Sequence, residues 1–389
     1  MGKRFVLVTV SVLAASLLAA ARASAQATCG GNIGSCGTIT SDNTAYGTTS
    51  AEFLLFAPSA RGQALGGGFA ALTTDVSAVY YNPAGLSQME HAGLMASSEN
   101  YIAGTKYTWA AVAVPFSGGS KAFGVSLANF GFSNQPVYTV DDPTGTSGQV
   151  YSVSETAIGL TYSQQFSDRF SAGLTAKYIN DALGEVTGNA FAVDFGTNFH
   201  AQLGGRPIRA SFVVQNLGTT ISHSGQVLDL LVQRTPPPGE QTVPQEGATA
   251  TLRSKDWPLP ITFRVGLAYD VFQTSAGRLS VLGEFTQPNN TAPGFDLGGE
   301  YAVSLGSSGF SVAGRASVLY APDNNVGTPD SASAGFVGSS NGSAQYRMSA
   351  GGGLYYRPGN APFSIGVDYA YRNMGLLGGV NMVTVGFTW

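Results

Sequence analysis

Charged side chains recur on one phase of several alternating segments, and they are the residues of this chain most suited to polar chemistry. In 261–271, Arg264 and Asp270 alternate with an apolar face that includes Phe263 and Val265. The residues of this polar phase are Glu155, Lys177, Asp194, Arg264, Asp270, Glu284, Asp296, Glu300, Arg315, Asp368 and Arg372. Acids and bases nearly balance, so two arrangements are open: a paired network that fills an interior, which we favour, or a ring of charges that selects ions.

Catalytic and metal-binding patterns find little support in the sequence. The three histidines, His91, His200 and His223, are dispersed along the chain and form no cluster with aspartate or glutamate at metal-ligand spacing. Cys29 and Cys36 lie in a glycine-rich stretch without a nearby histidine, which favours a short-loop disulfide in an oxidising compartment. We therefore expect no enzyme activity, no catalytic residue, no metal and no cofactor.

The N-terminus predicts export from the cytoplasm. Lys3 and Arg4 precede an apolar run that ends in Ala23-Ser24-Ala25, which is typical of a cleaved signal peptide over 1–25. Residues 26–50 would then form a flexible periplasmic leader. Removing the signal peptide's three basic residues, Lys3, Arg4 and Arg22, leaves 16 basic against 23 acidic side chains, or 16 − 23 = −7, which gives no sign of a nucleic-acid partner.

Composition narrows the fold class. Only 11% of the residues are charged and 52 are glycine, yet no later stretch reaches the roughly 18 apolar residues of a membrane helix. These values favour an all-β chain, either a secreted protein or a membrane barrel.

Alternation of apolar and polar residues predicts fourteen strands over 91–389. They cover 93–101, 108–116, 122–132, 152–166, 170–183, 189–201, 209–218, 261–271, 278–286, 295–303, 310–320, 347–357, 363–373 and 380–389. The connections at even-to-odd junctions are all short, and the long ones, 133–151, 219–260 and 321–346, fall only at odd-to-even junctions. An even number of strands, with short loops at one end and the long loops at the other, predicts a fourteen-stranded antiparallel transmembrane β-barrel. Such a barrel would lie in the outer membrane of a Gram-negative-type bacterium, with both termini periplasmic.

The closing strand carries an outward apolar face that ends on an aromatic residue. Val385, Phe387 and Trp389 share this face, and such an ending resembles the barrel-assembly signal of outer-membrane proteins. Membrane lipid and the barrel-assembly machinery are therefore expected partners.

Residues 51–90 lack the strand pattern and predict an N-terminal plug, or hatch, over the lumen. The block from Ser59 to Leu86 resembles the N-terminal signature of the PorV/PorQ family and, more distantly, the FadL superfamily of hydrophobic transporters. The residues that carry this resemblance are Arg61, Gly62, Gly66, Gly67, Asp75, Asn82, Pro83, Ala84, Gly85 and Leu86. It implies a fourteen-stranded barrel whose N-terminal segment enters the lumen from the periplasm.

The resemblance implies two alternative functions. A PorV-like barrel would act with the type IX translocon and pass secreted cargo to the cell surface, with the outer loops, among them Leu228, Leu230, Leu231 and Val232, as docking surface. We favour this hypothesis. A FadL-like barrel would instead take up hydrophobic small molecules, long-chain fatty acids or aromatics, by diffusion through an opening in the wall. Gly131, Phe132 and Pro136 mark the best candidate for such an opening.

Overall fold

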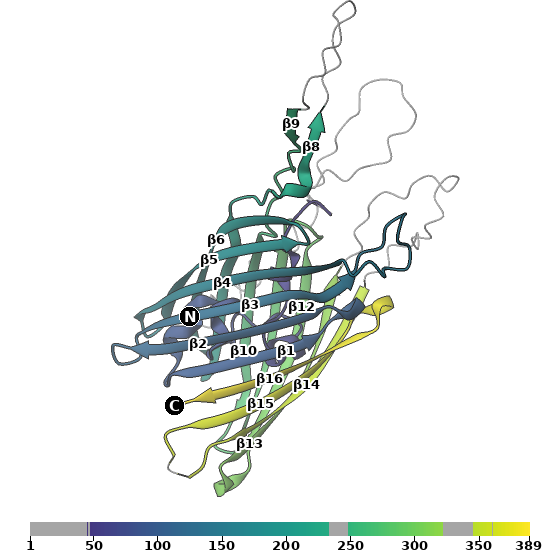
Figure 1. Ribbon diagram of the computed structural model, residues 1–389. Coiled ribbons are helices and arrows are strands. Elements are labelled where there is room, and N and C mark those ends of the chain that lie inside the picture. Colours follow the sequence, from purple (N-terminus) through teal and green to yellow (C-terminus); the bar gives the residue numbers. More distant parts are fainter. Residues whose placement is uncertain (1–44, 46, 233–247, 322–344, 360) are drawn as a thin grey trace, which may run out of the picture. The chain divides into compact units, whose positions relative to one another are not determined.

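Strands dominate the computed structural model, which describes residues 45, 47–232, 248–321, 345–359 and 361–389 (Figure 1). The first barrel strands are β1 (Gly93–Asn100), β2 (Lys106–Phe116), β3 (Lys121–Pro136), β4 (Val150–Ser167), β5 (Phe170–Leu183), β6 (Val186–Leu203) and β7 (Arg206–Gly218). The remaining ones are β10 (Thr262–Gln273), β11 (Gly277–Pro288), β12 (Gly294–Ser304), β13 (Phe310–Ala321), β14 (Gln345–Tyr356), β15 (Ser364–Asn373) and β16 (Gly379–Thr388). Each lies at one of the positions predicted from alternation.

The fourteen strands close into one antiparallel barrel. Neighbours in the chain are neighbours in the barrel, with β7 beside β10 and β16 beside β1. Gly93 pairs with Thr388 and Asn100 with Asn381, so the last strand seals the wall along the whole of the first. The predicted all-β fold and strand count are thereby confirmed. Among the described residues, no helix is long and apolar enough to cross a membrane.

The barrel has two rims that differ in their connections. We call the end that carries Trp389 the C-terminal rim; the tight turns at 117–120 and 204–205 lie there. The opposite end, the far rim, carries the long connections 137–149 and 219–261. The second of these contains a hairpin of β8 (Asp229–Val232) and β9 (Ala248–Thr251), which alternation had not predicted.

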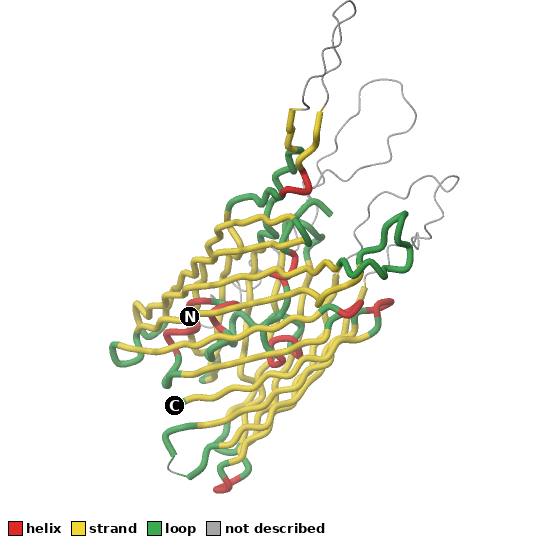
Figure 2. Tube along the Cα trace, viewed as in Figure 1, coloured by secondary structure: helices red, strands yellow, loops and turns green. Residues whose placement is uncertain are grey.

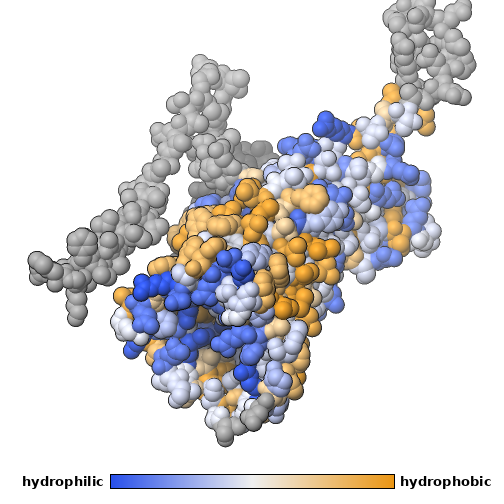
Figure 3. Space-filling model, turned by 90° about the vertical axis from the view of Figure 1, so that its left-hand side faces the viewer, coloured by the Kyte–Doolittle hydropathy of each residue, from blue (hydrophilic) through white to orange (hydrophobic). Residues whose placement is uncertain are grey.

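Side chains alternate between the lumen and the outer surface, as the period of a strand requires. On β10, Arg264 is 6% exposed while Leu267 is 55% exposed. Hydrophobic residues consequently gather in broad patches on the outer face of the strands (Figure 3). Charged residues on the same strands point inward, where a low dielectric makes pairing necessary.

The lumen is filled by the N-terminal segment, whose short helices cross it from one rim to the other (Figure 2). They are η2 (Glu52–Leu55), α2 (Ala60–Ala64), α3 (Ala78–Tyr81) and η3 (Pro83–Gln88). The amide of Ala45 donates to the carbonyl of Asn289, which follows β11 at the far rim. We expected this segment to enter from the same end as Trp389; its first described residues lie at the opposite rim, so for residues 45–50 that expectation was wrong.

Several predictions concern residues outside the described ones. They are the signal peptide over 1–25, the leader up to Thr44, the cysteine pair Cys29 and Cys36, and most of the loop 321–346. These remain predictions.

Candidate functional site

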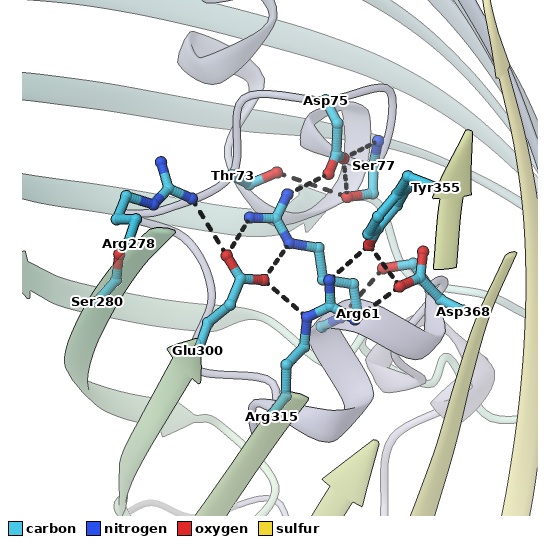
Figure 4. Close-up of polar contacts among 12 residues, drawn as sticks. Arg61, Thr73, Asp75, Ser77, Arg278, Ser280, Glu300, Arg315, Tyr355 and Asp368 are labelled. Carbon is cyan, nitrogen blue, oxygen red and sulfur yellow. Dashed lines mark hydrogen bonds and ion pairs between the residues drawn. The ribbon is translucent and has the colours of Figure 1, made fainter. Parts of the chain in front are cut away.

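Arg61 clamps the hatch to the barrel wall (Figure 4). Its Nε and Nη2 atoms donate to the two carboxylate oxygens of Glu300 on β12, each at 2.8 Å. Its Nη1 atom donates to Asp75 Oδ2 at 2.8 Å, within the hatch itself. The guanidinium also lies over the ring of Phe69, 4.8 Å from its centroid. Burial opposes the charge of Arg61, but Glu300 and Asp75 outweigh burial and raise the pKa of this side chain.

Glu300 is the centre of a wider network on the wall. Arg315 Nε donates to Glu300 Oε2 at 2.7 Å, and Arg278 Nη2 donates to Oε1 at 3.2 Å. Arg315 also reaches Asp368 Oδ1 at 2.6 Å, which accepts a second hydrogen bond from the hydroxyl of Tyr355. The side chains of Glu300 and Arg315 are each only 2% exposed. One carboxylate thus joins three wall strands to the hatch through charge-assisted hydrogen bonds.

A cavity of about 290 Å³ lies against this network. Arg61, Asp75 and Arg278 line it together with residues near the C-terminal rim, such as Ser364 and Thr388. Its charged lining is balanced: three arginines face Asp75, Glu300 and Asp368. The cavity therefore shows no preference for an ion of either sign.

Most of the other inward charges lie in pairs of opposite sign, whereas Glu155 and Asp296 lie beside other groups. Lys177 Nζ lies 2.6 Å from Asp194 Oδ2, and two Arg209 nitrogens each lie 3.0 Å from Asp270 oxygens. Arg264 lies 3.7 Å from Glu284. Glu155 faces Asp181 across the β4–β5 pairing, while Asp296 lies against Gly66 and Gly68 of the hatch. This arrangement favours a paired interior network over a ring of selecting charges.

The glycines of the predicted hatch motif allow close packing and tight turns. A Cβ on Gly62 would lie 2.1 Å from the hydroxyl of Tyr81, whose pKa is raised by burial. Gly66 and Gly67 have φ of 77° and 94°, a region that favours glycine. A Cβ on Gly85 would lie 2.3 Å from the carbonyl oxygen of Thr73. These residues let the hatch fold on itself inside a narrow lumen.

The Asn82-Pro83-Ala84-Gly85-Leu86 end of the motif docks on β3 to β6. Asn82 Oδ1 accepts from the amide of Ala84 at 3.1 Å, and its Nδ2 donates to the carbonyl of Thr197 on β6 at 3.1 Å. The carbonyl of Ala84 accepts from the hydroxyls of Ser163 at 3.1 Å and Ser171 at 3.2 Å. Here the wall holds the hatch with neutral hydrogen bonds.

Wall glycines make room for this contact, and no sequence pattern indicated them. Virtual Cβ atoms on Gly173 and Gly196 would lie 2.4 Å from the carbonyl carbon of Pro83 and 2.2 Å from Asn82 Oδ1. At Gly124 the corresponding neighbour is Val79, at 2.6 Å. Any side chain at these positions would push the hatch away from the wall.

An aromatic recess lies between the hatch and the wall toward the far rim. We define it by Phe56 of the hatch, Tyr101 after β1, Tyr107 on β2 and Phe130 on β3. The Phe56 ring centroid lies 4.6 Å from that of Tyr101, 5.6 Å from Tyr107 and 5.1 Å from Phe130. A small cavity of about 30 Å³ shares Tyr107 with this ring cluster and is lined by Phe53, Leu54 and Trp109, and also by Ser126 and Lys177. This part of the lumen offers rings and aliphatic groups.

The wall beside the recess is low and irregular. β2 begins pairing at Lys106 opposite Gly131, so residues 132–136 of β3 rise above it with a partner only on β4. That remaining ladder shifts register between Phe132 and Gln135, which marks a β-bulge. The Phe132 ring packs edge-on against Tyr151, 5.7 Å away. The candidate opening at Gly131, Phe132 and Pro136 therefore lies at a notch in the far rim, beside the aromatic recess.

Two inward-facing arginines lie next to the recess. Arg372 Nη2 lies 3.9 Å from Glu99, which lies two residues before Tyr101 on the same side of the chain. Arg347 on β14 and Arg372 on the neighbouring β15 both act electrostatically on Tyr101. Their Nε atoms, like Glu99 Oε1, are buried without a hydrogen-bond partner in the described part of the chain. Asp296 also interacts electrostatically with Arg372, so this end of the recess holds two guanidiniums together with the carboxylates of Glu99 and Asp296.

Sequence reasoning missed several of these residues. Glu99, Arg209, Arg278 and Arg347 carry charges on the inward phase, so alternation could have identified them. The aromatic recess combines residues from four separate segments, so no local pattern signals it. Among the described residues, no group of three or more histidine, cysteine, aspartate or glutamate side chains could hold a metal ion.

Comparison with known proteins gives similarity only at the level of solved structures. No family model matches the chain, and no curated protein matches it. The CymD monoaromatic hydrocarbon channel aligns with a TM-score of 0.49 at 12% identity, over 86% of this chain and 97% of CymD. A Pseudomonas aeruginosa FadL homologue gives 0.47 at 13%, over 85% and 98% of the two chains. The Ralstonia pickettii toluene transporter TbuX gives 0.47 at 12%, over 86% and 98%. Likeness at this level carries no argument about function.

Proposed function

We propose that the protein is an outer-membrane channel through which small hydrophobic molecules enter by diffusion. The observation that carries this proposal is the cluster of packed rings that we call the aromatic recess, which lies beside the bulged wall at Phe132. Aromatic rings and aliphatic groups bind apolar solutes without hydrogen bonds, and small-molecule sites are mostly lined in this way. This proposal corresponds to the second of the two functions considered from the sequence.

A membrane location is supported by the distribution of side chains over the barrel surface. Outward residues such as Leu160, Leu297 and Met348 are 59%, 68% and 63% exposed, while the charges of the same strands are buried inside. A bilayer stabilises the first group and penalises a charge on the lipid face. By the usual asymmetry of loops, the C-terminal rim would face the periplasm and the far rim the outside.

The proposed route begins at the notch above Gly131, where a solute would leave the outer leaflet or the far-rim surface. It would pass Phe132 into the recess and reach the small cavity beside Leu54 and Tyr80. Beyond this point the hatch lies across the lumen, and the cavity of about 290 Å³ lies between the hatch and β11–β16, so passage to the periplasm requires the hatch to move. The Arg61–Glu300 clamp lies on the opposite side of the hatch and would limit that movement.

The two arginines at the end of the recess narrow the proposed substrate class. Their Nε atoms have no hydrogen-bond partner among the described residues, and a guanidinium forms charge-assisted hydrogen bonds with a carboxylate. We therefore infer that hydrophobic acids enter more readily than neutral hydrocarbons of the same size. Arg347 and Arg372 would bind the head group, and the recess would bind the apolar body.

Uptake measurements on recess variants test the proposal. The full chain and the double variant Phe56→Ala/Phe130→Ala are compared in cells, with a labelled hydrophobic acid and a neutral hydrocarbon of equal size. We expect uptake of both to fall about tenfold or more, because two aromatic contacts of about 0.5–1.5 kcal/mol each are lost together with their buried area. Unchanged uptake of both compounds would exclude the recess as a route.

Two further variants serve as controls in this experiment. Phe191→Ala removes a ring that is 64% exposed on the outer surface and should leave uptake unchanged. Arg347→Gln/Arg372→Gln should lower uptake of the acid but not of the hydrocarbon. Equal loss for both compounds would contradict the inferred preference for acids.

A second candidate function is supported by the hairpin at the far rim. Leu230, Leu231 and Val232 on β8 are 45%, 78% and 49% exposed, which is unusual for a polar loop and suits a protein partner. The corresponding proposal is the PorV-like one, in which this surface receives exported proteins beside a type IX translocon. Crosslinking from native membranes would favour it if a translocon component or exported cargo is recovered with the wild type and lost with Leu231→Ser.

A further inference from the structure

The first described residues are held at the far rim by backbone hydrogen bonds. The amide of Ala45 donates to the carbonyl of Asn289 at 2.6 Å, and the amide of Ser50 donates to the carbonyl of Pro258 at 3.0 Å. Asn289 directly follows β11 and Pro258 precedes β10. Both acceptors thus belong to far-rim connections of neighbouring strands. We call residues 45–52 the rim strap.

Side chains hold the rim strap at two more positions. Ser50 Oγ donates to Asp181 Oδ2 at 2.9 Å, at the far-rim end of β5, and the same oxygen lies 3.0 Å from His223 Nε2. Asn290 Nδ2 donates to Glu52 Oε1 at 2.7 Å and to Oε2 at 2.6 Å. The contacts come from β5, from the β7–β10 connection and from the β11–β12 connection. This is more polar anchoring than a frayed chain end would have.

From the rim strap the chain descends through the whole lumen. The amide of Ala60 donates to Thr384 Oγ1 on β16 at 2.8 Å, in the middle of the barrel. The amide of Ser87 donates to Ser163 Oγ on β4, near the C-terminal rim, and Gly93 then pairs with Thr388. One continuous segment therefore links the two rims inside the barrel.

We propose that the rim strap faces the outside of the cell and holds the hatch in place from that side. This rests on the membrane orientation proposed above, in which Trp389 faces the periplasm. The chain then enters its own barrel from the outside, so an external contact at residues 45–52 could loosen a hatch whose other end joins β1. The proposal concerns a control point for the hatch and is independent of the substrate.

Cysteine labelling tests the position of the rim strap. In a Cys29→Ser/Cys36→Ser background, which has no other cysteine, Thr48→Cys is treated with a membrane-impermeant maleimide in intact cells. Thr220→Cys reports on the far rim, and Ser308→Cys reports on the C-terminal rim. We expect Thr48→Cys and Thr220→Cys to react in intact cells, and Ser308→Cys only after permeabilisation.

Each other outcome of the labelling has a defined meaning. If Thr48→Cys behaves like Ser308→Cys while Thr220→Cys reacts in intact cells, the strap position is overturned and the membrane orientation stands. If only Ser308→Cys reacts in intact cells, the orientation is wrong and the external strap fails with it.

Loss of one strap anchor tests whether the strap holds the hatch. Asn290→Ala removes two hydrogen bonds to a carboxylate, so amide exchange over residues 51–60 should accelerate by about tenfold or more. Asn189→Ala is the matched control, because Asn189 lies at the same rim and bonds only to β5 residues. Equal exchange rates in the hatch of both variants would overturn the holding role.

Discussion

The hatch is held by two kinds of contact on two sides of the barrel. Toward β12–β15, the contacts are charged: Arg61 bridges Glu300 and Asp75, and Arg315 extends the network to Asp368. Toward β1–β6, close packing and neutral groups predominate: the Asn82–Leu86 turn lies on Gly173 and Gly196, and Phe56 lies among rings. Two carboxylates on this side, Glu99 and Asp181, accept from the neutral side chains of Gln63 and Ser50. We call the two sides the charged side and the close-packed side.

The difference indicates which side can open. A buried ion pair is costly to separate, because each charge is left without a partner in a low dielectric. Ring contacts and van der Waals packing exchange readily for a solute of similar shape and polarity. A hydrophobic molecule can therefore replace contacts on the close-packed side while the charged side keeps the hatch attached.

Removing the clamp should have the largest effect on the charged side. Arg61→Ala leaves Glu300 with one bidentate partner fewer and Asp75 without its ion pair. Breaking a buried pair costs about 3–5 kcal/mol, so the hatch should detach from β12 in a large fraction of molecules. Hydrogen exchange over residues 60–75 and single-channel conductance in planar bilayers measure this directly.

An exposed ion pair supplies the control for this variant. Arg253 lies 3.9 Å from Asp256, but its side chain is 89% exposed, so Arg253→Ala should change neither exchange nor conductance. Equal behaviour of Arg61→Ala and Arg253→Ala would show that the clamp does not hold the hatch.

A single methyl group should disturb the close-packed side to a smaller extent. In Gly173→Ala the new Cβ would lie 2.4 Å from the carbonyl carbon of Pro83, so the Asn82–Leu86 turn must shift. Overpacking of this kind costs about 1–3 kcal/mol, and exchange should increase over residues 82–88 while residues 60–75 stay protected. Gly299→Ala, with its nearest neighbour at 3.7 Å, is the control. Loss of protection over the entire hatch would show that the charged side and the close-packed side do not hold the hatch independently.

The barrel itself could be predicted from the sequence, because strand alternation is a local property. Each outward apolar residue and each inward charge, such as Leu267 and Arg264, follows from the period of two. The resemblance of the Ser59–Leu86 block likewise indicated a hatch. The direction of the hatch could not be predicted, since it depends on where Ala45 and Ser50 find partners at a rim built from distant loops.

The site was harder to predict than the wall. Inward charges could be named from their phase, but their partners depend on distances across the lumen, as between Arg61 and Glu300, which are separated by 239 positions. Gly173 and Gly196 look like ordinary strand glycines until the hatch lies against them. Phe56, Tyr101, Tyr107 and Phe130 belong to separate segments, and only the closed barrel brings their rings together.

The loop 137–149 follows the bulged strand β3 on the close-packed side. One exposed carboxylate organises this connection: Asp142 accepts from the amides of Ser147 at 2.6 Å and Thr146 at 3.1 Å. These two backbone donors hold the pKa of Asp142 well below its ordinary value. A depressed folded-state pKa means that the stabilisation is complete above the unfolded value of about 3.9 and is lost as the pH falls through the folded value.

Acid should therefore loosen this loop only under strongly acidic conditions, and Asp142→Asn should loosen it slightly at neutral pH. Asparagine keeps one acceptor oxygen but loses the charge, so the amides of Thr146 and Ser147 should exchange a few times faster, the smallest effect predicted here. Amide exchange of residues 137–149, followed from neutral to acidic pH, measures both changes. The neighbouring Asp141→Asn is the control, since Asp141 is an exposed carboxylate of the same loop and no loop amide donates to it in the described chain. If Asp142→Asn exchanges like Asp141→Asn, the order of the loop comes from its β3 and β4 ends, and the bulged wall alone determines the shape of the notch.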